Sequence, residues 1–87
     1  MDIGKVRDLV AKDEEMLFNG CFNEKVVRAD LSTRREKRNA YIKYFNKFVE
    51  DHRTISNAVQ SQDATLAEKS KKCQKEASRL LDIVYSY

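Results

Sequence analysis

Few side chains in this sequence are suited to chemistry. There is one histidine, His52, and two cysteines, Cys21 and Cys73. One imidazole and two scattered thiols form neither a nucleophilic triad of any specificity nor a metal knuckle, and we expect both thiols to be reduced. Two glycines, Gly4 and Gly20, are too few for a phosphate-cradling loop. The sequence therefore predicts no enzyme, no cofactor, no metal site and no small-molecule substrate.

The acidic residues and the histidine also have structural interpretations. Asp13, Glu14 and Glu15 are adjacent, so on a helix they fan out about 100° apart and cannot face one substrate together. We expect them to form a solvated helix face. His52 stands between Phe48 and Ile55 at helical spacing, which predicts an inward-pointing polar residue that is hydrogen-bonded within a bundle. The alternative is that its protonation makes assembly sensitive to pH.

A seven-residue repeat would position these groups. From Tyr41 to Tyr87 the chain has no Gly and no Pro, and apolar or semi-apolar residues recur at every seventh position. This pattern is typical of helices that present a continuous seam to another helix. The side chains predicted to form that seam or to bind a partner are Tyr41, Tyr44, Phe45, Phe48, His52, Ile55, Val59, Leu66, Leu80, Val84 and Tyr87.

The first third of the chain predicts one helix and a connector. Apolar residues at helical spacing predict helix one over residues 2–18, with Asp2 as its N-cap and Asn19-Gly20 as its stop. Asp13 interrupts the apolar stripe, which predicts a kink or two short pieces joined there. Residues 19–31 form a connector or a short helix; a two-residue β-hairpin turn at Asn19-Gly20 is the alternative.

Two capping boxes mark the starts of the longer helices. Thr33 with Glu36 predicts the start of helix two over residues 33–61, and Thr65 with Glu68 predicts the start of helix three over residues 65–87. A polar stretch between them predicts a chain reversal near residues 61–64.

The fold class follows from these elements. We predict an all-α protein with one helical domain over residues 1–87, in which helices two and three form an antiparallel hairpin and helix one packs against it. Because Leu66 follows Val59 by seven residues, the seam stays in phase across the polar stretch. The alternative is therefore one coiled-coil rod, about 80 Å long at ~1.5 Å per residue.

Charge suggests a second class of partner. Charged residues make up 36% of the chain and its net charge is +3, a surplus too small to establish an anionic partner. Basic residues nevertheless gather before and within helix two and again at residues 69–79, and an antiparallel hairpin is expected to bring both groups toward one end. The candidate phosphate-binding residues are Arg34, Arg35, Arg38, Lys43, Lys47, Lys72 and Lys75.

The function predicted from the seam is a non-enzymatic protein–protein interaction module: a small helical subunit, adaptor or inhibitor of a larger complex, or a chain that associates with itself. A nucleic-acid-associated protein that uses the basic residues is the alternative. No apolar run of the signal-peptide or membrane-spanning type follows Met1. We therefore expect no membrane partner and an intracellular, cytoplasmic location, with the nucleus as the alternative.

Overall fold

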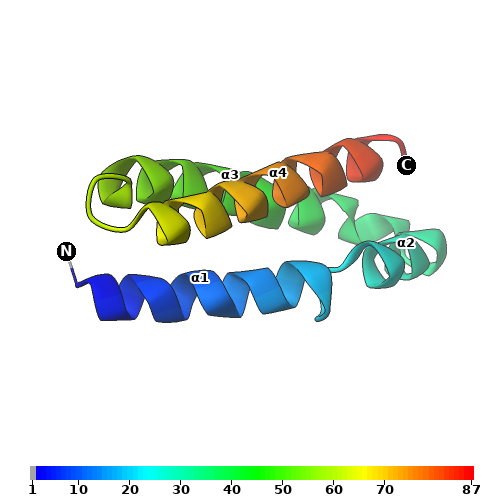
Figure 1. Cartoon of the computed structure of the whole chain (residues 1–87). Coiled ribbons are helices and arrows are strands. Elements are labelled where there is room, and N and C mark those ends of the chain that lie inside the picture. The colour runs from blue at the N-terminus through cyan, green and yellow to red at the C-terminus, as the bar shows by residue number, and fades with distance from the viewer. Residues whose placement is uncertain (1) are drawn as a thin grey trace.

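The computed structural model describes residues 2–87, which form helices and no strand. The elements are α1 (Ile3–Phe18), α2 (Glu24–Thr33), a short 3-10 helix η1 (Arg35–Lys37), α3 (Arg38–Val59) and α4 (Ala64–Tyr85) (Figure 1). The prediction of an all-α fold is confirmed, and the β-hairpin turn considered at Asn19-Gly20 is wrong.

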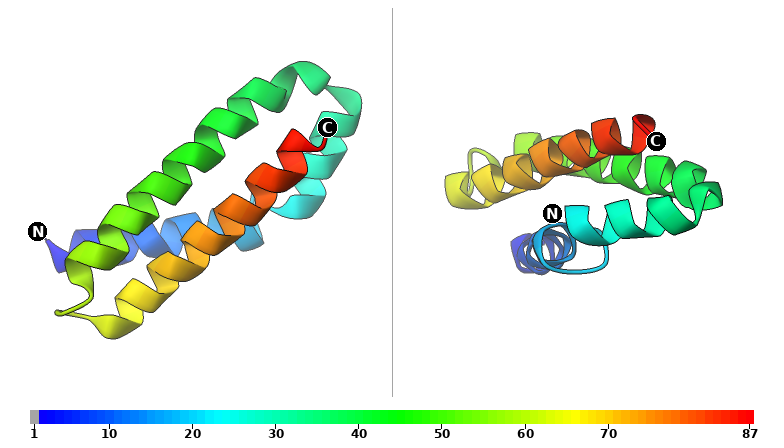
Figure 2. Two further views of the ribbon diagram at one scale, coloured as in Figure 1. Left: turned by 90° about the horizontal axis from the view of Figure 1, so that it is seen from above. Right: turned by 90° about the vertical axis from the view of Figure 1, so that its right-hand side faces the viewer.

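The two long helices form an antiparallel hairpin. α3 and α4 lie side by side along their lengths and are joined by a turn at residues 60–63 (Figure 2). The predicted hairpin is confirmed and the continuous rod is wrong. Asp63 explains the break, because its backbone is extended and its carboxylate accepts a hydrogen bond of 3.0 Å from the N–H of Leu66. A helix cannot continue through that conformation, so a new one starts after it.

α1 crosses one face of the hairpin. In the view from above it runs beneath α3 and α4 at an angle to them, and α2 lies near the open end of the hairpin, where the carboxyl terminus also lies (Figure 2). α1 makes most of its contacts with α4 and fewer with α3. Its amino-terminal half lies near the α3–α4 turn, since Val10 packs in one cluster with Val59 and Leu66.

The predicted ends of helix one hold. Asp2 caps α1 by accepting a hydrogen bond from the N–H of Lys5. Asn19 and Gly20 end it, because both backbone N–H groups donate to the carbonyl of Glu15. A Cβ at Gly20 would lie 3.0 Å from the Cα of Met16, so the close return of the chain favours glycine there. The two short pieces considered at Asp13 are wrong, since α1 is one continuous helix.

The predicted starts of the long helices are displaced. Thr33 is the last residue of α2, and its hydroxyl donates back to carbonyls of the preceding turn instead of capping helix two. η1 follows, and α3 begins only at Arg38. Likewise Asp63, not Thr65, is the N-cap of α4. Residues 19–31 contain the loop after α1 and most of α2.

The core consists of two clusters. The larger joins Leu17 of α1 and Val27 of α2 to Phe45 and Leu80 of the hairpin, all without exposed surface. The smaller lies at the turn end, where Val10 and Val59 meet. Between the two clusters the interior is polar. That junction, and the groove beside it, are the features that bear on function.

Candidate functional site

A polar junction connects three helices between the two apolar clusters. His52 of α3 has no exposed surface; its Nε2 lies 2.8 Å from Asp13 Oδ2 of α1, and its Nδ1 lies 2.9 Å from Ser70 Oγ of α4. The Ser70 hydroxyl also donates to the backbone carbonyl of His52 at 3.0 Å. Every polar group of the junction therefore has a partner, as buried polar groups require.

The junction confirms one prediction and overturns another. His52 is a buried, hydrogen-bonded polar residue, as its seam position predicts. Asp13, however, does not belong to a solvated face: it is 6% exposed, while its neighbour Glu15 points to solvent. An acid, an imidazole and a hydroxyl in a row also occur in nucleophilic triads. Here Ser70 is completely buried, so the junction as folded presents no hydroxyl to a substrate.

An aromatic cluster lies next to the junction and centres on Phe22. This residue follows α1 in the loop, and its ring lies 5.5 to 6.3 Å, centroid to centroid, from the rings of Tyr41, Tyr44, Phe45 and Phe48 on α3. Edge-to-face pairs of this kind stabilise beyond the area they bury. Sequence reasoning missed Phe22; the available signal was a large apolar residue directly after a helix stop.

Tyr41 anchors α2 to α3. Its hydroxyl donates to Asp30 Oδ2 at 2.6 Å, and burial, followed by this hydrogen bond to a carboxylate, raises the pKa of Tyr41 above its ordinary value. α2 is thereby held beside the aromatic cluster.

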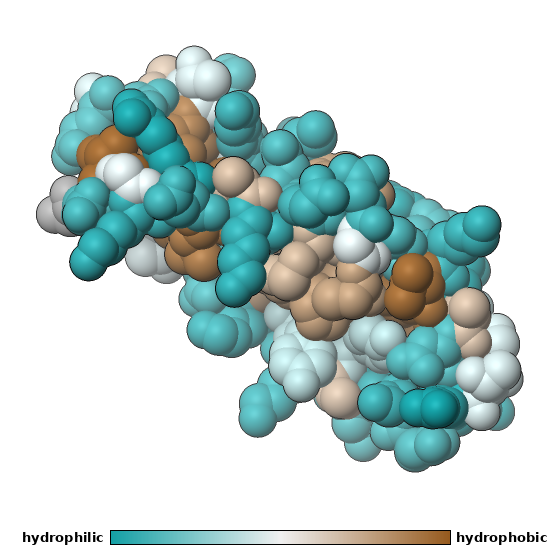
Figure 3. Space-filling model, turned by 90° about the horizontal axis from the view of Figure 1, so that it is seen from below, coloured by the Kyte–Doolittle hydropathy of each residue, from teal (hydrophilic) through white to brown (hydrophobic). Residues whose placement is uncertain are grey.

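A groove opens between α1 and α3 beside the aromatic cluster. Its volume is about 360 Å³, and its apolar lining comes from Leu9 on α1, Phe22 in the loop, and Tyr44 and Phe48 on α3. Leu9 and Tyr44 are 43% and 49% exposed. Asp13 also contributes to the lining, and Lys47 and Asp51 of α3 complete it. Apolar side chains reach the surface along the middle of the face that carries α1, among hydrophilic ones (Figure 3). We call the groove lined by these residues the α1/α3 groove.

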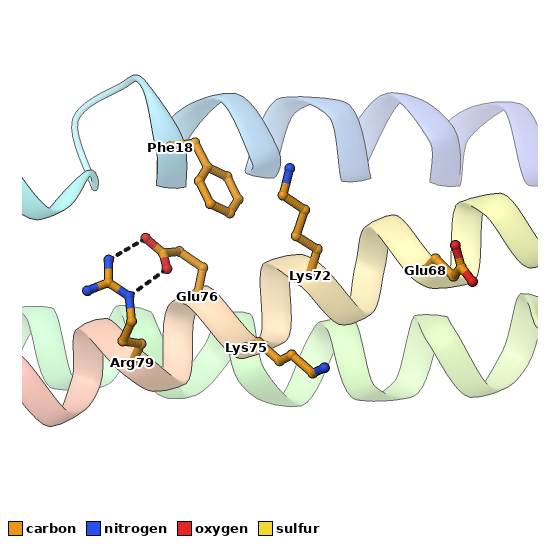
Figure 4. Close-up of a pocket in the computed structure, with 6 residues that line it drawn as sticks. All are labelled: Phe18, Glu68, Lys72, Lys75, Glu76 and Arg79. Atoms are coloured by element: carbon orange, nitrogen blue, oxygen red, sulfur yellow. Dashed lines mark hydrogen bonds and ion pairs between the residues drawn. The ribbon is translucent and has the colours of Figure 1, made fainter.

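A second hollow lies between the end of α1 and α4, and it is charged. Phe18, Lys72 and Arg79 line it, with Lys72 Nζ 4.6 Å from the centre of the Phe18 ring (Figure 4). Arg79 forms a forked ion pair with Glu76 and also binds Glu24, and these hydrogen bonds raise the pKa of Arg79. Its positive charge is therefore already neutralised by carboxylates of this chain.

Most of the predicted seam residues lie inside the hairpin. Those classed as buried are Tyr41, Phe45, His52, Val59, Leu66, Leu80 and Val84. Phe48, Ile55 and Tyr87 are partly buried, and Tyr44 is exposed. The seam is thus filled by the chain's own helices, and Tyr44 and Phe48 are the seam residues that line the α1/α3 groove.

The candidate phosphate-binding residues are scattered. Arg35 and Arg38 donate to the backbone carbonyls of Tyr87 and Tyr85. Because His52 pairs with Ser70, residues 69–72 lie level with the middle of α3, whereas Arg79 bonds Glu24 of α2; the second basic group therefore extends from the middle of the hairpin toward its open end. The remaining candidates are as follows: Lys47 pairs with Asp51, Lys72 lies 4.0 Å from Glu14, and Arg34, Lys43 and Lys75 make no ion pair within residues 2–87.

Comparison with known proteins adds no function. The chain matches no protein-family model, no curated protein and no solved structure. Across residues 2–87, no helix has an apolar stretch of the length needed to cross a membrane. Over the same residues, no three His, Cys, Asp or Glu side chains are grouped so that they could hold a metal ion.

Proposed function

We propose that this chain is a non-enzymatic protein–protein interaction module, a small helical subunit, adaptor or inhibitor, which binds its partner through the α1/α3 groove. The observation that carries the proposal is the exposure of Leu9 and Tyr44 beside the partly buried rings of Phe22 and Phe48. Large apolar side chains that line one concave surface among charged ones are typical of interaction sites.

The groove, rather than the seam, is the proposed contact surface, because most seam residues are already buried against the chain's own helices. A partner that inserted between α3 and α4 would have to displace Phe45 and Leu80, which have no exposed surface. The groove needs no such rearrangement. Tyrosine at its rim suits this role, since tyrosine supplies a large contact area at a low cost in side-chain entropy.

The compartment proposed for the module is the cytoplasm, with the nucleus as the alternative. Cys21 and Cys73 are free thiols, and Cys21 is exposed. Free, exposed thiols are typical of proteins in reducing compartments.

A matched pair of variants tests the groove. Leu9 and Val26 are 43% and 41% exposed and both lie on helices, but only Leu9 lines the groove. We expect Leu9→Lys to abolish cross-linking to a partner identified by mass spectrometry with the wild-type chain, while Val26→Lys preserves it. Far-UV circular dichroism verifies that both variants remain helical. Equal cross-linking by the two variants would contradict the proposal.

A second candidate function is nucleic-acid association, favoured by the exposure of Arg34, Arg35 and Lys37 around η1, beside Arg38. Binding through phosphates predicts that affinity falls with salt, with a slope of ≈ −0.9 per contacted phosphate on a log–log scale for duplex DNA. Replacing Arg34 and Arg35 with glutamine removes two phosphate contacts and should reduce the magnitude of that slope by about two. An unchanged slope, or affinity that is indifferent to salt, rules this candidate out.

A further inference from the structure

The rim of the α1/α3 groove carries one charge of each sign on a single helix. Tyr44, Lys47, Phe48 and Asp51 stand at positions i, i+3, i+4 and i+7 of α3, so they form one stripe on its surface. The side chains of Lys47 and Asp51 are 74% and 46% exposed and lie 3.1 Å apart. Within a helix, a cation that precedes its anion by four residues is the weaker arrangement. Lys47 and Asp51 can therefore readily give up this contact and pair with opposite charges on a partner.

The two exposed apolar residues lie at opposite ends of the groove. Tyr44 is at the end closed by Phe22, whose ring centre is 5.5 Å from its own. α1 runs antiparallel to α3, because Asp13 meets His52 and Val10 packs with Val59. Leu9, one turn before Asp13, is therefore at the other end, level with or beyond Asp51.

This arrangement is complementary to itself. When a second α3 is laid antiparallel along the groove, about a two-fold axis between Lys47 and Asp51, each lysine faces the aspartate of the other copy. The same operation brings Tyr44 of each copy to the end of the groove that holds Leu9 of the other. A contact in which residue i meets j and j meets i is what a two-fold interface requires.

We infer that the occupant of the α1/α3 groove is a second copy of this chain, bound as a two-fold dimer in which Lys47 pairs with Asp51 of the other copy and Tyr44 packs against Leu9 of the other copy. The inference rests on the proposed function of the groove.

Charge reversal tests the pairing directly. Lys47→Glu places two acidic residues opposite each other in a homodimer, and Asp51→Lys places two lysines opposite each other. We expect each variant alone to have a dimer dissociation constant at least about tenfold above that of the wild type in sedimentation equilibrium at low salt, because like charges oppose association. Circular dichroism controls for folding, and Lys47→Gln, which adds no repulsion, should show a smaller effect.

Mixing the two variants is the decisive step. In a mixed dimer Glu at position 47 faces Lys at position 51, and Asp51 faces Lys47, so both contacts are complementary again. We expect an equimolar mixture to return to within about threefold of the wild-type dissociation constant. The ion pair within each chain stays broken on mixing, so a merely intramolecular role for Lys47 and Asp51 cannot produce this rescue.

Two results would overturn the inference: a wild-type chain that remains monomeric up to about 1 mM, or single-variant dimers that mixing does not strengthen. Neither result would contradict the proposed function, which the Leu9→Lys and Val26→Lys variants test separately. If the Leu9→Lys chain still loses a cross-linked partner that the Val26→Lys chain retains, the groove binds a different protein. If both variants retain it, the groove is not the binding surface at all.

Discussion

Replacing Asp13 with alanine removes the partner of a histidine that has no exposed surface. Nε2 of His52 lies 2.8 Å from Asp13 Oδ2, and its other ring nitrogen is already engaged by Ser70. A buried polar group left without a partner costs ~1–3 kcal/mol. Because Asp13 also borders the α1/α3 groove, water can enter the vacated space. We therefore expect a loss of about 2–3 kcal/mol.

That loss is large for a chain of this size. At ~0.05–0.15 kcal/mol per residue, the free energy of unfolding of 87 residues is roughly 4–13 kcal/mol. A shift of ~4–8 °C per kcal/mol then lowers the melting temperature by about 10–20 °C. Urea unfolding followed by far-UV circular dichroism measures the difference, since the free energy falls linearly with urea concentration.

Glu14→Ala is the matched control. Glu14 adjoins Asp13 in sequence, but it lies on the surface with its nearest cation, Lys72 Nζ, 4.0 Å away. A surface pair of this kind contributes no more than ~1 kcal/mol. The double variant Asp13→Ala/His52→Leu should lose less stability than the sum of its parts, because removing His52 also removes the ring nitrogen that Asp13→Ala leaves without a partner. Equal losses for Asp13→Ala and Glu14→Ala, or strict additivity in the double variant, would refute the reasoning.

Three further results are expected. A thiol reagent should modify exposed Cys21 rapidly and Cys73 only on unfolding, since burial raises the pKa of Cys73 to about 12; stopped-flow absorbance separates the phases. The hydrogen bond from the backbone of Leu66 lowers the pKa of Asp63, so its contribution is present above about pH 4 and lost as pH falls through the lowered pKa. Asp63→Ala should therefore destabilise more at pH 7 than at pH 2 in urea titrations. Phe45→Ala should cost ~3–5 kcal/mol by urea unfolding, because Phe45 is fully buried.

The hairpin could be predicted from the sequence because its two seams repeat with the period of packed helices. Phe45 and Leu80 were expected to be hidden against a neighbouring helix, and both have no exposed surface. The spacing could not decide between a hairpin and a rod, since Val59 and Leu66 stay seven residues apart in either case. In the folded chain both residues point into one cluster from opposite sides of the turn. Asp63 ends the continuous helix and caps α4, and this local conformation produces the hairpin instead of the rod.

Helix starts were less predictable because several residues near each one can cap. Thr33 followed by Glu36 satisfies the capping pattern, yet the Thr33 hydroxyl bonds the carbonyls of its own helix. The choice depends on where α2 docks, and Tyr41 fixes that by bonding Asp30. A contact between two helices thus overrode a local signal that the sequence displays plainly.

The polar junction could have been predicted only by reading two helices together. Val10, Asp13 and Leu17 stand at steps of three and four residues, so Asp13 occupies the buried stripe of α1. His52 occupies the corresponding stripe of α3. Each alone is a polar residue in an unfavourable place, and Asp13, beside two other carboxylates, was assigned to the surface. Because buried polar groups require partners, an acid on one apolar stripe and an imidazole on another are best explained by each other.

This pairing also limits how α1 can dock. Apolar contacts tolerate small displacements, since Val10 and Leu17 could bury similar area after a shift of one helical turn. The hydrogen bond between Asp13 and His52 does not tolerate such a shift: moving α1 by one turn, about 5.4 Å, would leave a buried imidazole and a buried carboxylate each without its partner. The polar junction therefore selects one register of α1. The same register sets the position of Leu9 relative to Phe48 and Asp51, and with it the shape of the α1/α3 groove.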